Sequence, residues 1–93
     1  MIELFDNCAN CIPFGSALKE LNVFQDAGIV VLDGDILDAE GRYTYDNWYF
    51  EFNPMLDDLQ NCEESINRAK QYIEAYKERN GTDFSVVFVT RES

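Results

Sequence analysis

The chain has 93 residues, 46% of them hydrophobic, and its eighteen Asp and Glu against seven Lys and Arg give a formal net charge of −11. This length predicts one acidic domain over residues 1–93, and the apolar content excludes the weakly hydrophobic composition of a disordered chain. Because phosphate contacts need Lys and Arg, the charge argues against direct binding to nucleic acid and to an anionic membrane surface.

The sequence also lacks the usual targeting signals. There is no run of about 18 apolar residues, the length that suggests a transmembrane helix. Residues 1–6 lack the basic start and apolar stretch of a signal peptide. Three cysteines, an odd number, do not suit a secreted disulfide framework. We therefore expect a cytoplasmic protein with reduced thiols.

The first predicted helix follows a short N-terminal segment. Residues 2–5 are a candidate edge strand, and residues 6–13 have the composition of a loop. Apolar residues then recur at helical spacing, namely Phe14, Ala17, Leu18, Leu21 and Phe24. This pattern predicts a helix over residues 14–25, which Gly28 would end in the left-handed conformation.

The middle of the chain predicts strands separated by turns. The apolar run at residues 29–32 is typical of a buried strand, and Asp33-Gly34-Asp35 is typical of a turn. Residues 43–52 are predicted as a strand with Trp48 facing the core. A second turn at Asp46-Asn47 would make residues 29–52 a meander of two or three antiparallel strands.

The C-terminal third predicts a long helix and a central strand. One apolar stripe is formed by Leu59, Cys62, Ile66, Ala69, Ile73 and Tyr76. It predicts a helix over residues 61–79, with Asn61 and Glu64 as its capping pair. Residues 84–89 are apolar on both faces, which favours a central strand. We expect four side chains of these two elements to be buried: Ile66, Ile73, Val87 and Val89.

The fold class follows from the element order (β)-α-β-β-(β)-α-β. This order predicts an α+β domain, in which a small antiparallel or mixed sheet of three to five strands has two helices packed on one face. If residues 2–5 join the sheet, the order matches a ferredoxin-like, split β-α-β arrangement. If they do not, the fold is an α-β-meander-α-β variant.

Two motifs suggest chemistry but are incomplete. Cys8 and Cys11 form a C-x-x-C pair, which can exchange disulfides or supply half of a zinc site. The chain has no histidine, and Cys62 is the only further cysteine. Residues 33–40 are rich in carboxylates, but their spacing departs from a calcium-binding loop. We interpret the first motif as two loop thiols and the second as a solvated turn, and expect neither metal nor cofactor.

Catalysis has little support in the sequence. Without histidine there is no His-based general base, nucleophilic triad or His metal ligand. No glycine-rich phosphate loop is present. Two carboxylates can hydrolyse a glycoside, but a domain of this size has little room for a cleft. We therefore expect a protein that is not an enzyme.

The acidic residues are concentrated in one stretch. Residues 26–64 contain eleven acids and one base, whereas residues 65–93 contain four acids and five bases. Such a charge favours a basic protein surface as the partner. Exposed tyrosines beside acids are good interface material, and Tyr43, Tyr45, Tyr49 and Glu51 share a face if their strand is regular. The candidate partner-binding residues are Asp33, Asp35, Asp38, Glu40, Tyr43, Tyr45, Asp46, Tyr49, Glu51, Asp57 and Asp58.

Three hypotheses for function follow. In size and charge, with no shared motif, the chain is similar to small inhibitors and immunity proteins that block nucleases or phage-defence complexes. That similarity implies a non-enzymatic inhibitor whose acidic face mimics nucleic acid towards a basic, nucleic-acid-binding partner. The first alternative is a structural or assembly module, either monomeric or homodimeric, whose charge serves only solubility. The second is a thiol-redox or metal protein that uses Cys8 and Cys11.

Overall fold

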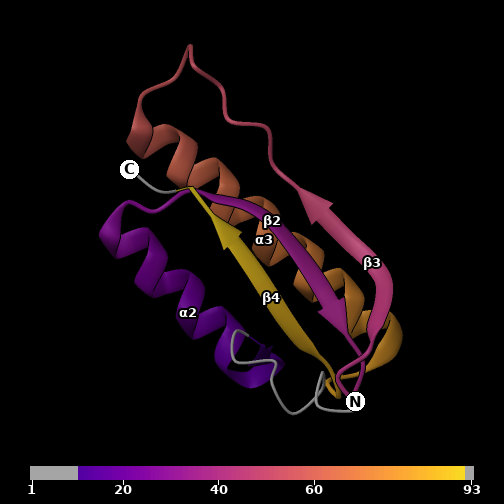
Figure 1. The fold of residues 1–93 in the computed structure, drawn as a ribbon. Helices are drawn as coiled ribbons and strands as arrows, with labels where there is room; N and C mark the ends of the chain where they lie inside the picture. The colour runs from indigo at the N-terminus through magenta and orange to yellow at the C-terminus, as the bar shows by residue number, and fades with distance from the viewer. Residues whose placement is uncertain (1–10, 92–93) are drawn as a thin grey trace.

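The computed structural model describes residues 11–91, which form two helices and a four-stranded sheet (Figure 1). In chain order the elements are β1 (Ile12–Pro13), α2 (Phe14–Ala27), β2 (Val31–Leu37), β3 (Tyr43–Tyr49), α3 (Asp58–Asn80) and β4 (Ser85–Thr90). The predicted α+β class and element order are confirmed. No helix in the described part of the chain is both long and apolar enough to cross a membrane.

The sheet order is β1-β4-β2-β3, and every neighbouring pair is antiparallel. β4 is therefore a central strand, as predicted. Because β4 is antiparallel to both neighbours, β1 and β2 are parallel and are separated by β4, which makes β1-α2-β2 a split β-α-β unit. The predicted strand at residues 2–5 lies outside the described residues, so the ferredoxin-like arrangement stays a prediction.

Both helices lie on the same face of the sheet (Figure 1), where α2 packs on α3 and β4, and α3 packs on β2. Ile66 and Ile73 have no exposed surface, as predicted. Val87 is only half-buried and Val89 is 46% exposed, so the prediction of burial was wrong for both. The reason is alternation along β4: Val86 points to the helices and has no exposed surface, while Val87 and Val89 point to the opposite face.

The predicted turn at Asp33-Gly34-Asp35 is wrong, because these residues lie in the middle of β2. A side chain at Gly34 would overlap the indole ring of Trp48 on the neighbouring strand. Glycine is therefore required here for close packing rather than for a turn. Trp48 itself is 5% exposed and belongs to the core.

The turn that joins β2 to β3 lies at residues 38–42. One carboxylate oxygen of Asp38 accepts hydrogen bonds from the backbone N–H groups of Glu40 at 2.9 Å and Arg42 at 3.0 Å. These bonds, together with the nearby Arg42 guanidinium, hold the pKa of Asp38 below its ordinary value. Asp38 is thus a structural residue of the hairpin.

The predicted turn at Asp46-Asn47 is a bulge within β3. Asn47 stands opposite Asp35, while Tyr43 stands opposite Leu37, so residues 44–46 face the single residue Ile36. The Thr44 hydroxyl donates to the Ile36 carbonyl at 2.9 Å. Tyr45 takes a φ of 69°, which non-glycine residues seldom adopt.

The long helix begins earlier than predicted. Asp57 is its N-cap and forms a capping box with Gln60, so the proposed pair Asn61 and Glu64 was wrong. Asn61 is instead fully buried, and its side chain exchanges two hydrogen bonds with the backbone of Asn53, at 2.8 and 2.9 Å. This contact fastens the segment after β3 to the helix.

The ends of the shorter elements also shift. Gly28 ends α2 in the left-handed conformation with a φ of 72°, as predicted. β3 ends at Tyr49 rather than at residue 52, although Phe50 still donates its backbone N–H to the Leu32 carbonyl at 2.9 Å. Leu59, the first member of the predicted apolar stripe, is 60% exposed.

Candidate protein-binding surface

The sheet face opposite the helices presents carboxylates among apolar and aromatic side chains. Asp33 of β2 stands between Val89 of β4 and Tyr49 of β3, and the next such row on this face has Asp35 at its centre. Directly opposed residues on paired strands point to the same side of a sheet. We call the two rows together the open face: Asp33, Asp35, Asn47, Tyr49, Val87 and Val89. Tyr49 and Val89 are exposed, at 71% and 46%, and Asp33, Asp35 and Val87 are half-buried between them.

The two carboxylates of the open face are not neutralised within the described chain. Neither Asp33 nor Asp35 has an ion-pair partner among residues 11–91. Partial burial, and then the adjacent charge of Asp33, raise the pKa of Asp35 above its ordinary value. A cation brought to this face would relieve the repulsion between the two charges.

Most of the other predicted acids have partners elsewhere in the fold. Arg42 forms ion pairs with both Asp38 and Glu40 in the hairpin turn. Asp46 accepts a hydrogen bond from the Tyr72 hydroxyl at 2.9 Å, on the helix side of β3.

Two of the acids after β3, Asp57 and Asp58, are separated from the open face. Asp57 caps α3, as described above. Asp58 lies 3.8 Å from Arg91, near the start of the same helix. Glu51 is exposed just beyond the end of β3. The eleven predicted residues therefore do not form one continuous surface.

The three predicted tyrosines are exposed, but they differ in position. Tyr49 lies on the open face, and Tyr43 stands opposite Leu37 near the hairpin turn. Tyr45 is 92% exposed at the bulge, where the regular alternation of β3 is broken. The expectation that all three would share a face assumed a regular strand, and the bulge at residues 44–46 removes that condition.

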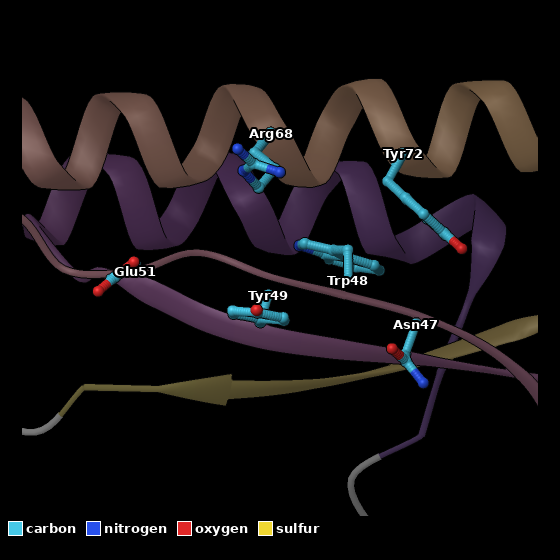
Figure 2. Close-up of a pocket in the computed structure, with 6 residues that line it drawn as sticks. All are labelled: Asn47, Trp48, Tyr49, Glu51, Arg68 and Tyr72. Carbon is cyan, nitrogen blue, oxygen red and sulfur yellow. The ribbon is translucent and has the colours of Figure 1, made fainter.

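A groove of about 500 Å³ lies between β3 and α3 (Figure 2). It is lined by Asn47, Trp48, Tyr49, Glu51, Arg68 and Tyr72. Arg68 and Tyr72 are four residues apart, hence on the same side of α3. The Tyr72 ring stacks on Trp48 with a centroid separation of 5.1 Å. Burial and the bond to Asp46 raise the pKa of Tyr72.

Sequence reasoning missed the helix side of this groove. Arg68 and Tyr72 are four residues apart in the predicted helix, and this spacing is a signal that they share a side of it. Nothing in the sequence shows that β3 lies beside that side. That contact depends on β3 being at the sheet edge next to α3, a property of the topology rather than of local pattern.

Two of the three cysteines, Cys11 and Cys62, lie among the described residues. Among residues 11–91 there is no group of three or more Cys, Asp or Glu arranged to hold a metal ion. Cys62 is buried, and burial followed by the charge of Glu63 raises the pKa of its thiol, which disfavours the thiolate. Cys11 is disulfide-bonded, against the interpretation of a loop thiol, and Cys8 lies outside the described residues.

Comparison with known proteins identifies the family of this chain. Residues 6–90 match the family described as Immunity protein 40. No curated protein and no solved structure matches the chain. The family match extends over nearly the whole sequence, including both helices and all four described strands. The chain therefore belongs to the Immunity protein 40 family.

Proposed function

We propose that this protein neutralises its toxin by placing the open face over a basic, nucleic-acid-binding surface of that toxin. Membership of an immunity protein family implies a partner toxin and an inhibitor that acts by binding. The observation that supports the finer proposal is the pair Asp33 and Asp35, two carboxylates at the centre of the open face that have no ion-pair partner within residues 11–91.

The composition of the open face suits a protein interface with a basic partner. Val87, Val89 and Tyr49 supply apolar and aromatic area around the charges, and aromatic residues are enriched where interfaces are most deeply buried. Toxins that act on nucleic acid must offer Lys and Arg to phosphates, which in duplex DNA occur at one charge per about 1.7 Å. A chain with a net charge of −11 would be drawn to such a surface over a distance.

We expect the double substitution Asp33→Asn and Asp35→Asn to slow association with the toxin on the order of tenfold at low salt, because electrostatic steering acts mainly on the association rate. The same variant should show a flatter dependence of that rate on salt. Stopped-flow or surface-plasmon measurements at low and high salt would report both quantities.

The matched control is the double substitution Glu74→Gln and Glu78→Gln. It changes the net charge equally, but both residues are exposed on α3, on the helix side of the sheet. We expect the control to slow association much less. If the two double variants slowed association equally, only the overall charge would matter, and the open face would not be the binding surface.

The Asp33→Asn and Asp35→Asn variant should bind more slowly without being less stable than the parent protein. A raised pKa means that the charged form of Asp35 is disfavoured in the folded state, and this cost is present at pH values above that raised pKa. It disappears as the pH falls and the carboxyl becomes protonated. Asparagine removes the charge at every pH, so the double variant should unfold at the same temperature as the parent at pH 7, or at a higher one.

A further inference from the structure

β3 is an edge strand, and part of its outer side has no hydrogen-bond partner in the described chain. The Phe50 N–H donates to the Leu32 carbonyl, which makes these two residues a hydrogen-bonded pair. Such pairs alternate along antiparallel strands, so Trp48 bonds to Gly34, whereas Asn47 and Tyr49 direct their backbone groups away from the sheet.

Tyr72 covers only one end of this edge. Its hydroxyl lies against the backbone N–H of Asn47 and also donates to Asp46. The Asn47 carbonyl and both backbone groups of Tyr49 remain directed outward. An unpaired stretch of this kind is a template for another extended segment.

The groove beside this edge contains two donors without an acceptor among residues 11–91. Trp48 is 5% exposed, and its buried indole Nε1 has no hydrogen-bond partner in that part of the chain. In Figure 2 this nitrogen is on the Arg68 side of the ring. Arg68 is exposed and has no ion pair among residues 11–91. Buried polar groups are normally satisfied, so this unpaired donor indicates an acceptor supplied from outside.

Building on the proposed function, we infer that the β3 edge from Asn47 to Glu51 binds an extended segment of the toxin as an additional strand of the sheet. Side chains of such a segment alternate between two sides. Those beside the open face would be basic and would meet Asp33 and Glu51. Those over the groove would carry an acceptor oxygen for Arg68 and for the Trp48 indole.

Charge favours a toxin segment over a second copy of this chain. Pairing two β3 edges would bring together Asp46 and Glu51 of two molecules that each carry a net charge of −11. Like charges across paired strands are destabilising. A segment with basic side chains on the open-face side instead places its charges near Asp33 and Glu51.

Tyr49 allows a test that separates the backbone from the side chain. Its N–H makes no bond within the sheet, so Tyr49→Pro removes this donor at an edge position that tolerates proline. Tyr49→Ala removes the same side chain and keeps the N–H. The binding partner in this test is the toxin, which is first captured with the parent protein as bait and then purified. Capture of the toxin is not by itself evidence for the added strand.

We expect Tyr49→Pro to bind the toxin about tenfold more weakly than Tyr49→Ala, because the segment loses a backbone hydrogen bond and meets the proline ring. In parent protein, amide hydrogen exchange at Tyr49 should slow when the toxin is bound. The exchange measurement decides the question even if the proline variant fails to fold.

Two results would overturn this inference: equal affinity of the proline and alanine variants, or exchange at Tyr49 that the toxin leaves unchanged. Dimerisation of the parent through β3, detected by sedimentation and abolished by Tyr49→Pro, would also overturn it. If the Asp33 and Asp35 substitutions still flatten the salt dependence in those cases, the proposed function stands without the added strand. If the Asp33 and Asp35 substitutions leave the salt dependence unchanged, but Tyr49→Pro still binds more weakly than Tyr49→Ala, the proposed function fails instead.

Discussion

Gly34→Ala is expected to lower the free energy of unfolding by about 3 kcal/mol, a cost typical of overpacking in a well-packed core. The added methyl group would occupy the space of the Trp48 ring, which cannot retreat because Tyr72 stacks against it. Relief would require the indole to leave its site and expose apolar surface. Urea-induced unfolding, followed by the fluorescence of the single tryptophan, would measure the loss.

The matched control is Gly15→Ala. Gly15 lies in the first turn of α2, where a methyl group would meet nothing within 4 Å. Alanine favours helices over glycine by about 1 kcal/mol, so this variant should be as stable as the parent or more stable. Equal destabilisation by both substitutions would mean that the Trp48 ring does not lie over Gly34.

Ile73→Ala should cost roughly 2–5 kcal/mol, the range for removing most of a buried isoleucine side chain. Ile73 has no exposed surface and lies in the core formed by α3, α2 and the sheet. On the same helix, Leu59 is 60% exposed, so Leu59→Ala should change stability by no more than about 0.5 kcal/mol. Chemical denaturation would measure the free energy of unfolding of both variants. A larger loss for Leu59→Ala than for Ile73→Ala would contradict this packing.

The elements that the sequence predicted well are those with a strong local pattern. The spacing of apolar residues found both helices, and Gly28 marked the end of the first one. The apolar run in the last strand indicated a central position, which the sheet order confirms. Burial of Val89 was predicted wrongly because an apolar run does not show whether one or both faces of a sheet are covered.

The errors near residues 33–47 have a common physical cause. Asp33-Gly34-Asp35 has the composition of a turn, but Gly34 serves a tertiary contact with Trp48 that no local pattern encodes. The bulge around Tyr45 likewise depends on how β3 meets Ile36 of the neighbouring strand.

Prediction of the candidate site was limited for a related reason. Charge density identified the acidic stretch but not which acids already had partners. Asp57 as a helix cap and Asp38 as a turn residue are engaged by the backbone, and only the fold separates them from Asp33 and Asp35. The sequence therefore predicted the character of the surface better than its location.

The most direct test of the central claim is carbodiimide labelling of carboxyl groups, read by mass spectrometry, on the protein alone and in complex with its purified toxin. If the open face is the binding surface, labelling of Asp33 and Asp35 falls severalfold in the complex, while Glu74 and Glu78 on the helix side react as before. Unchanged labelling of Asp33 and Asp35, with protection of the α3 carboxylates instead, would contradict the account.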